Sequence, residues 1–287
     1  MKDEHRADYR QLDVAPTLTR IRKLQSDRRY RDQHRLFFVE GVRNFVAAMD
    51  QRFSIETLLY SEKLLTAPLA RKFVRQSKRA GVPFARVSPE AFRSISSAEH
   101  ASGVAAILHQ RIQTLEQIQP DQFSCWTVLS NVQSLGNFGT LLRTSAAIGA
   151  AGFILLGQHI DPYEPVVVRA TMGALFKQTL VRTNVEQFRR WIHTHRLAVI
   201  GASPDGVVEY DQVRYTRPTI LLLGNERSGL TDEQRSLCKQ IVRIPMVAGS
   251  DSLNLAVAGS LLLYAVFRST VKEGNDVNVA AAREEST

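Results

Sequence analysis

The sequence predicts an α/β protein of two domains, because apolar strands and amphipathic helices alternate along most of its 287 residues. A Gln-rich stretch that contains Pro120 interrupts this alternation, and the basic residues are distributed unevenly on its two sides. We expect both ends of the chain to be disordered, because they are polar and lack a periodic apolar pattern. The predicted parts are a head at 1–16, a first domain at 17–110, a linker at 111–123, a second domain at 124–270 and a tail at 271–287.

The first domain is predicted to be a small α/β unit whose helices carry most of the positive charge. One very basic helix spans 17–34, and Leu18, Ile21 and Leu24 recur in it at helical spacing. A second helix, 67–80, has basic residues and no acidic one. The remaining pattern predicts a helix at 42–49 and strands at 36–39, 55–60, 82–87 and 104–108.

The second domain has nearly continuous apolar runs, which are typical of strands buried on both faces of a parallel sheet. These strands are predicted at 126–129, 152–156, 179–182, 197–201, 219–223 and 241–244, and the helices at 138–149, 165–176, 185–196, 232–239 and 252–267. Ligands bind such sheets at the carboxyl ends of the strands. The loops after Leu129, Leu223 and Ile244 are therefore the candidate site.

Charge and composition restrict the class of function. The net charge is +9, and residues 1–120, with 21 basic and 13 acidic side chains, account for 21 − 13 = +8 of it. Such an excess favours a polyanionic partner, nucleic acid before a membrane surface, although a merely solvated basic face has the same pattern. The short apolar runs, the polar start and the two isolated cysteines lead us to expect no membrane segment, no metal site and a cytoplasmic location.

The loop after Leu223 reads LLLGNERSGLTDEQ. Gly224 and Gly229 have the spacing of a phosphate-binding P-loop, but Leu230 stands where that motif requires lysine, which argues against a nucleoside triphosphate. Thr231 is predicted to cap the following helix. Glu226 is a carboxylate at the end of a hydrophobic strand, where it requires partners, so it is a candidate site residue.

The loop after Ile244 reads IPMVAGSDSLNLAVAGS. Ser250 or Asp251 is predicted to cap the next helix, which places Ser252 and Asn254 in its first turn. Free backbone N–H groups and polar side chains meet a ligand at such a helix start. The first half of the helix is rich in small residues, which permits close packing of another backbone, and its second half is bulky enough for a core or a subunit interface.

The loop after Leu129 continues into NFGTLLRTSAAIG. Asn137 is predicted to be the N-cap of this helix. Gly139, Ala146 and Ala147 lie three or four residues from Arg143, so the helix face around its guanidinium is stripped of bulk. A structural arginine would have an acid at one of these positions, and its absence favours a functional role for Arg143.

In this order, NFGTLLRTSAAIG, VVRATMGALF, LLLGNERSGL and IPMVAGSDSLNLAVA resemble the motifs of the SpoU/TrmH branch of the SPOUT RNA methyltransferases, over roughly residues 17–270. The first domain, with RLFFVEG at 35–41, is similar to the family's L30e-like substrate-binding domain. The resemblance implies a C-terminal parallel-sheet SPOUT domain with a deep trefoil knot, and a homodimer with its site near the subunit interface. One departure is Leu135-Gly136, where the family often has Asp-Pro; it implies a shifted loop.

The resemblance also implies the reaction, which is methyl transfer from S-adenosylmethionine to a ribose 2′-hydroxyl of structured RNA. Ribosomal RNA is expected before transfer RNA, and a non-catalytic RNA-binding or ribosome-assembly factor with the same fold is the alternative. Whether Arg143 accepts a proton or stabilises charge stays open. The residues expected to bind the cofactor are Gly224, Ile244, Met246 and Leu253, and those expected in catalysis are Arg143, Asn137, Glu226, Ser252 and Asn254. The basic helices supply the expected RNA contacts, at Arg22, Lys23, Arg28, Arg29, Arg71, Lys72 and Arg75.

Overall fold

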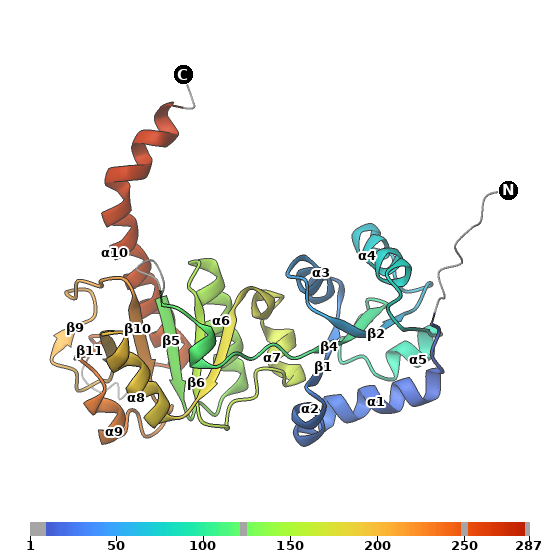
Figure 1. Cartoon of the computed structure of the whole chain (residues 1–287), viewed down its shortest axis with the longest axis horizontal. Helices are drawn as coiled ribbons and strands as arrows, with labels where there is room; N and C mark the ends of the chain where they lie inside the picture. The colour runs from blue at the N-terminus through green and yellow to red at the C-terminus, as the bar shows by residue number, and fades with distance from the viewer. Residues whose placement is uncertain (1–9, 121–124, 248–251, 285–287) are drawn as a thin grey trace. The chain divides into compact units, whose positions relative to one another are not determined.

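The computed structural model describes residues 10–120, 125–247 and 252–284 (Figure 1). Backbone contacts divide the chain into two compact units. The first is Met1–Arg111 together with Asp161–Lys177, and the second is Ile112–Ile160 together with Gln178–Thr287. Within the described ranges, no helix has both the length and the apolar character that crossing a membrane requires.

The first unit is built on a four-stranded sheet with the order β1-β4-β2-β3. Strand β4 is antiparallel to β1 and β2, and β3 is parallel to β2. Helices α3 and α4 cover one face of this sheet, and α1, α2 and α5 lie on the other (Figure 1). The small α/β unit predicted from the pattern is thus confirmed. Its elements are α1 (Val14–Ser26), α2 (Arg28–His34), β1 (Leu36–Glu40), α3 (Val42–Asp50), β2 (Ile55–Tyr60), α4 (Pro68–Arg79), β3 (Phe84–Arg86), α5 (Pro89–Arg93) and β4 (Val104–His109).

The beginning of the first unit differs from the prediction. The helix expected over 17–34 starts earlier, at Val14, and is broken at Asp27, whose side chain caps α2 by accepting the Tyr30 N–H (3.1 Å). The backbone N–H of Leu12 donates to the Phe84 carbonyl (2.8 Å), so the end of the predicted disordered head is ordered against β3. Residues 1–9 of that head lie outside the described residues.

Residues 161–177 pack with the first unit, whereas a division into two contiguous domains places them in the second. The helix predicted over 165–176 is two shorter elements, α7 (Pro165–Ala170) and the 3-10 turn η2 (Ala174–Lys177). The backbone between them has positive φ at Met172 and Gly173, and a Cβ on Gly173 would press against the Ala47 side chain. Phe37 stacks against Tyr163, with 4.3 Å between ring centroids, and so joins this segment to β1.

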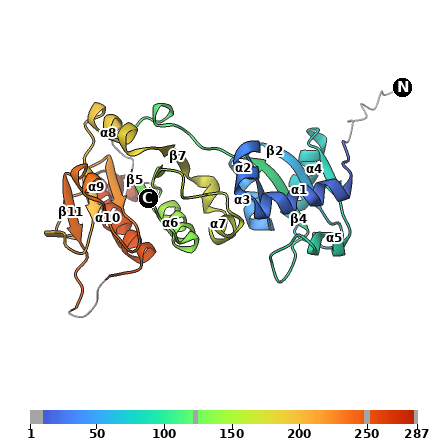
Figure 2. The same ribbon diagram turned by 90° about the horizontal axis from the view of Figure 1, so that it is seen from below.

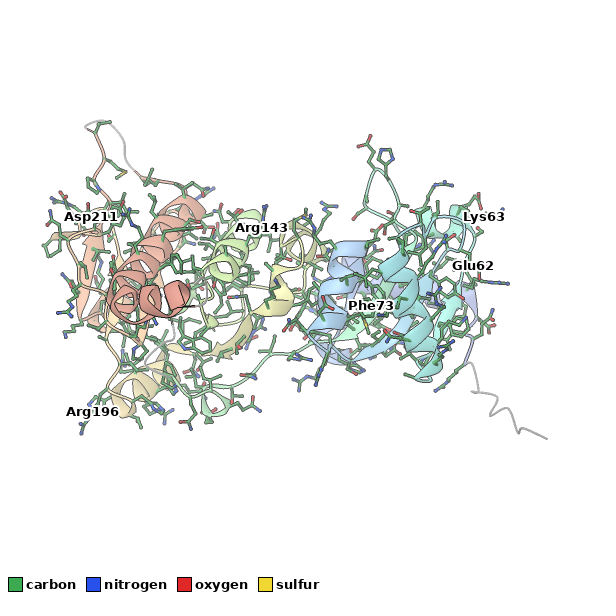
Figure 3. All side chains as sticks on the ribbon, turned by 90° about the horizontal axis from the view of Figure 1, so that it is seen from above. Glu62, Lys63, Phe73, Arg143, Arg196 and Asp211 are labelled. Atoms are coloured by element: carbon green, nitrogen blue, oxygen red, sulfur yellow. The ribbon has the colours of Figure 1, made fainter. Side chains whose placement is uncertain are left out.

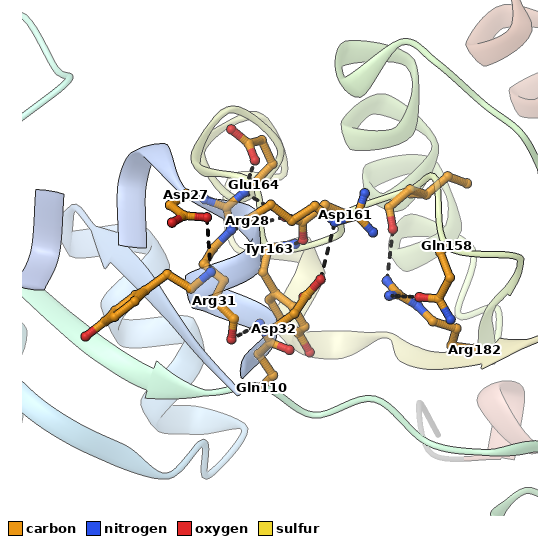
Figure 4. A network of polar contacts seen from close by, with 12 residues as sticks. Asp27, Arg28, Arg31, Asp32, Gln110, Gln158, Asp161, Tyr163, Glu164 and Arg182 are labelled. Atoms are coloured by element: carbon orange, nitrogen blue, oxygen red, sulfur yellow. Dashed lines mark hydrogen bonds and ion pairs between the residues drawn. The ribbon is translucent and has the colours of Figure 1, made fainter. Parts of the chain in front are cut away.

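A buried ion cluster also attaches this segment to α2 (Figure 4). Arg31 is 1% exposed, and its guanidinium donates to Asp161 Oδ2 from Nη2 (2.7 Å) and from Nε (3.1 Å). The same guanidinium pairs with Glu164 and donates to the Leu24 carbonyl (2.7 Å). Because a buried charge is costly without partners, all of these contacts are needed to keep Arg31 inside the first unit.

The second unit is built on a seven-stranded sheet with the order β7-β6-β5-β10-β8-β11-β9 (Figure 2). Every pairing in it is parallel, which confirms the parallel sheet predicted from the apolar runs. The strands are β5 (Cys125–Ser130), β6 (Gly152–Leu156), β7 (Thr179–Thr183), β8 (Val199–Ala202), β9 (Val208–Glu209), β10 (Thr219–Leu223) and β11 (Gln240–Arg243). The helices are α6 (Leu135–Ala147), α8 (Val185–Thr194), α9 (Asp232–Ser236) and α10 (Leu255–Glu284).

Two segments expected to lie outside this unit extend it. In the predicted linker, Leu115 and Ile118 are buried in the core of the second unit, with the short turn η1 (Leu115–Gln117) between β4 and β5. The N–H of Gln113 donates to the Leu180 carbonyl (2.8 Å), which ties the linker to β7. At the other end, α10 continues through Glu284, so most of the tail predicted at 271–287 is helical.

Candidate functional site

A cavity of about 310 Å³ lies in the second unit, at the carboxyl ends of the neighbouring strands β10, β8 and β11. The loops after these strands form its walls, and the beginning of α10 completes it. All four residues expected to bind the cofactor line this cavity, as do two of those expected in catalysis. They are Gly224, Ile244, Met246 and Leu253, with Glu226 and Ser252. The position at the carboxyl ends of parallel strands is the one expected for a ligand of this type of sheet.

A tight turn after β10 forms one wall. Asn225 and Gly229 exchange two backbone hydrogen bonds (3.0 Å each), and Asn225 Oδ1 accepts the N–H groups of Arg227 (2.9 Å) and Ser228 (3.1 Å). A Cβ on Gly224 would collide with the backbone of Gly229, so only glycine fits there. These contacts account for Asn225, which the pattern alone left without a role. Thr231 and Gln234 form the predicted cap at the start of α9.

We expect Gly224→Ala to abolish cofactor binding, because the added methyl group must push the Asn225–Gly229 turn out of place and change the wall of the cavity. Isothermal titration with S-adenosylmethionine measures the loss, which we expect to be at least about 100-fold in affinity, as for a misplaced binding wall. Gly136→Ala is the matched control, because a Cβ there meets only a serine hydroxyl at 3.9 Å. Unchanged affinity in Gly224→Ala would contradict the role given to this turn.

Glu226 joins the turn after β10 to the loop after β5. Its carboxylate accepts the backbone N–H groups of Gln133 (3.0 Å) and Ser134 (2.9 Å) and the side-chain amide of Asn137 (3.4 Å). Burial raises the pKa of Glu226, but these hydrogen bonds outweigh burial and hold the pKa below its ordinary value. The carboxylate is thus an ionised acceptor that fixes the start of α6 in place.

Two asparagines extend this connection to α10. Asn254 Nδ2 donates to Asn137 Oδ1 (2.9 Å), and Asn254 Oδ1 accepts the N–H of Ala256 (2.9 Å) at the start of the helix. Asn137 is not the N-cap of α6 as predicted, because Ser134 has that position and accepts the Asn137 N–H (3.2 Å). The Asn137 side chain is therefore available to bridge Glu226 and Asn254.

Helix α10 packs closely on α6. Thr144 and Ser260 share a hydrogen bond between their hydroxyls (2.9 Å), and a Cβ on Gly259 would strike Leu141 of α6 and Leu223 of β10. The small residues in the first half of α10 thus allow the close approach that the sequence predicts. This packing holds the three polar loops of the site against one another.

Arg143 lies on α6 and is exposed (Figure 3). No side chain or carbonyl within the described residues forms a hydrogen bond or an ion pair with its guanidinium. It does not line the cavity, and neither does Asn254. Ser252 lines the cavity and is exposed, whereas Ser250 and Asp251, the predicted caps of α10, lie outside the described residues.

The cavity also has walls that the pattern did not single out. Ala202, Ser203 and Pro204 follow β8, and Arg227 lies in the turn after β10. The rule that places ligands at the carboxyl ends of parallel strands applies equally to β8. The loop after β8 was overlooked because it lacks a polar cluster of the kind that marks the other three loops.

The residues expected to contact RNA fall on two separate faces of the first unit. Arg71, Lys72 and Arg75 are exposed together on α4, on one side of the sheet (Figure 1). The others belong to α1 and α2 on the opposite side, where several already have partners. Arg22 donates to Ser94 (3.0 Å), Lys23 lies over the Tyr30 ring (5.6 Å) and Arg28 pairs with Asp32 (3.4 Å), while Arg29 is exposed.

This architecture, a parallel α/β unit with its cavity at the strand ends beside a smaller basic unit, is shared with known proteins. The SpoU rRNA Methylase family profile matches residues 125–264, and the MRM3-like substrate binding domain profile matches residues 15–106. An AdoMet-bound rRNA methyltransferase from Sinorhizobium meliloti superimposes with a TM-score of 0.82 at 31% identity, over 90% of this chain and 97% of that one. The chain therefore belongs to the SpoU rRNA Methylase family.

Two curated relatives have more specific descriptions. A 23S rRNA (uridine(2479)-2′-O)-methyltransferase from Streptomyces viridochromogenes is 29% identical over 82% of this chain and 83% of its own length. A 23S rRNA (guanosine(2553)-2′-O)-methyltransferase from Bacillus subtilis is 24% identical over 64% of this chain and 72% of its own. The deep trefoil knot of the second unit stays an implication of this family membership.

Proposed function

We propose that this protein transfers a methyl group from S-adenosylmethionine to a ribose 2′-hydroxyl of ribosomal RNA. The observation that carries the proposal is the cavity at the ends of β10, β8 and β11 in a chain of the SpoU rRNA Methylase family. Ribosomal RNA is preferred to transfer RNA because both curated relatives described above are named for 23S rRNA. Such a substrate corresponds to a cytoplasmic protein.

The cavity fits the cofactor in its chemistry. Leu223, Val242 and Leu255 supply apolar walls, and the backbone of Gly224 and Ile244 supplies hydrogen-bonding groups without competing side chains. When bound, S-adenosylmethionine supplies an electrophilic methyl group on a positively charged sulfur. The Asn225–Gly229 turn and the start of α10 would hold it, because they form opposite walls.

The other half of the reaction requires a nucleophile. A free 2′-hydroxyl is hardly ionised at neutral pH, so the site must hold its oxygen in place and stabilise the charge that develops on it. Arginine keeps its proton in proteins. We therefore assign Arg143 the stabilisation of the RNA phosphate and the developing oxyanion rather than the removal of a proton. Glu226, Asn137 and Asn254 act as positioning residues that hold the three loops together.

The proposed reaction is tested by incubating the protein with labelled S-adenosylmethionine and either purified ribosomal RNA or purified transfer RNA. We expect label in ribosomal RNA, at a 2′-O-methylated nucleotide that resists alkaline cleavage. Methylation of transfer RNA alone would transfer the assignment to that substrate. Binding of RNA without cofactor binding or methyl transfer would instead support a non-catalytic ribosome-assembly factor.

Helix α4 is the proposed RNA-binding face, because its basic side chains have no acidic neighbour on the helix. We expect charge reversal of Arg71, Lys72 and Arg75 to weaken RNA binding at low salt by at least about tenfold and to flatten its salt dependence by roughly 0.7–0.9 in logarithmic slope for each lost contact. Filter binding across a salt series measures both, and cofactor affinity should not change. The matched control reverses Arg22, Lys23 and Arg29, on the opposite face. Equal losses from the two triple variants would contradict a single binding face.

Helix α10 is the proposed dimer interface. Val257, Leu261 and Tyr264 form one exposed apolar stripe along it, at 49%, 37% and 48% exposure. We expect Leu261→Glu with Tyr264→Glu to convert a dimer into a monomer in analytical ultracentrifugation, because two like-charged stripes cannot pack together. Val207→Glu, at an exposed apolar residue outside α10, should leave the mass unchanged. A monomeric parent protein would refute the interface.

A further inference from the structure

A second cavity, of about 240 Å³, lies inside the first unit. It is enclosed by the end of β1, the start of α3, the loop before β4 and helix α7. Phe38 and Val168, both buried, contribute apolar surface. Gly41 leaves part of the wall without a side chain and has a φ of 99°, which favours glycine. Phe38, Glu40 and Gly41 come from the RLFFVEG stretch, to which the methyl-transfer site assigns no role.

The rim of this cavity is cationic. Arg43, His100 and Arg169 line it and are exposed. Arg169 Nη1 donates to Ser97, at the carbonyl (3.3 Å) and at the hydroxyl (2.9 Å), which fixes its guanidinium beside the opening. Arg43 has no hydrogen-bond or ion-pair partner in the part of the chain that the structure describes. Two guanidinium groups at one opening favour a ligand that brings a phosphate.

The interior, in contrast, presents acceptors. The Glu40 carboxylate accepts the Ser97 N–H (3.0 Å) on one oxygen and the Ser96 hydroxyl on the other, so each oxygen keeps a lone pair. Asn44 is only 7% exposed, and its Nδ2 donates to the Glu40 carbonyl (3.3 Å). Asn44 Oδ1 has no donor among the described residues, which is costly for a buried oxygen. A ligand that satisfies these groups must present N–H donors.

We propose that this cavity binds one unstacked nucleotide of the RNA substrate and prefers guanine. Guanine is the base whose pairing edge presents neighbouring N–H and NH₂ donors, which match a carboxylate and an amide oxygen. Uracil places acceptors on both sides of its single N–H, and these would face the Glu40 carboxylate. The thioether of Met172, which is exposed at the cavity, can pack against the base, and Arg43 and Arg169 take the phosphate. The assignment rests on the proposed function, because it requires an RNA substrate.

Two methionines make the test direct, since Met172 lines this cavity and Met246 lines the cofactor cavity. We label the full chain with ¹³C at the methionine methyl groups and titrate it with each of the four nucleoside 5′-monophosphates. The guanosine nucleotide should shift the Met172 signal and leave that of Met246 in place, whereas S-adenosylmethionine should do the reverse. The uridine nucleotide should bind about tenfold more weakly, which is the difference expected when a buried acceptor is left unpaired.

Two variants locate the contacts. Asn44→Leu should weaken the guanosine nucleotide about tenfold, because it removes the buried acceptor without removing the side chain's bulk. Arg43→Gln with Arg169→Gln, at exposed positions where folding is not in question, should abolish the difference in affinity between guanosine and its 5′-monophosphate. Arg93→Gln, an exposed arginine of the same unit that does not line the cavity, is the matched control and should change nothing.

The outcomes separate this inference from the proposed function. If S-adenosylmethionine shifts Met246 but no nucleotide shifts Met172, the nucleotide site is overturned and the enzyme assignment stands. Equal responses to all four bases would overturn the guanine preference. A failure of S-adenosylmethionine to shift Met246 would count against the proposed function, whatever happens at Met172.

Discussion

Replacing Arg143 with alanine should reduce methyl transfer by about 10²–10³-fold while leaving cofactor binding unchanged, as expected when one group that stabilises transition-state charge is removed. Arg143 is exposed and does not line the cofactor cavity, so its loss removes neither a wall nor a packing contact there. The measurement is single-turnover methyl transfer to ribosomal RNA at saturating cofactor, with cofactor affinity determined separately by calorimetry.

The matched control is Arg190→Ala, which removes another exposed arginine of the second unit, on α8, away from the cofactor cavity. Arg143→Lys separates the two roles that the sequence leaves open. A role in charge stabilisation predicts that lysine restores part of the rate, because it keeps the positive charge. Near-normal turnover of Arg143→Ala would refute both roles. A pH–rate profile that shifts in Arg143→Lys would favour proton transfer.

Much of the second unit was predictable because parallel strands are apolar on both faces and leave an unambiguous pattern. The strand at Gly152–Leu156 and that at Thr219–Leu223 have the predicted bounds. The candidate site was partly predictable for a related reason, since the carboxyl ends of neighbouring parallel strands meet at one edge. The polar residues after Leu223 and Ile244 therefore had to come together around one cavity.

The pattern failed where a side chain's role depends on distant partners. Asn137 looks like a helix cap from its neighbours alone, but Glu226 and Asn254, far away in the sequence, bind its side chain. Residues 161–177 were assigned to the second domain because their neighbours in sequence belong to it. Nothing in a local pattern shows that Tyr163 will pack against Phe37 of the other unit.

Arg31 is the clearest example of this failure, and it gives the prediction with the largest effect on stability. Within its basic helix it resembles the exposed arginines around it, but its partner Asp161 is 130 residues away. Arg31→Ala should lower the free energy of unfolding of the first unit by about 3–5 kcal/mol, because it leaves Asp161 as a buried charge without its partner. Arg93→Ala, which removes an exposed ion pair of the same unit, should have no detectable effect.

The two tryptophans allow the two units to be observed separately, since Trp126 and Trp191 both belong to the second unit. In urea, we expect circular dichroism of Arg31→Ala to show an early transition that tryptophan fluorescence does not detect. Replacing the pair together, as Arg31→Met with Asp161→Leu, should recover part of the loss, because no unpaired charge then stays buried. If Arg31→Ala unfolds at the same urea concentration as the parent by both probes, the ion cluster does not hold residues 161–177 on the first unit. If both probes move together, the segment instead stabilises the two units as one cooperative structure.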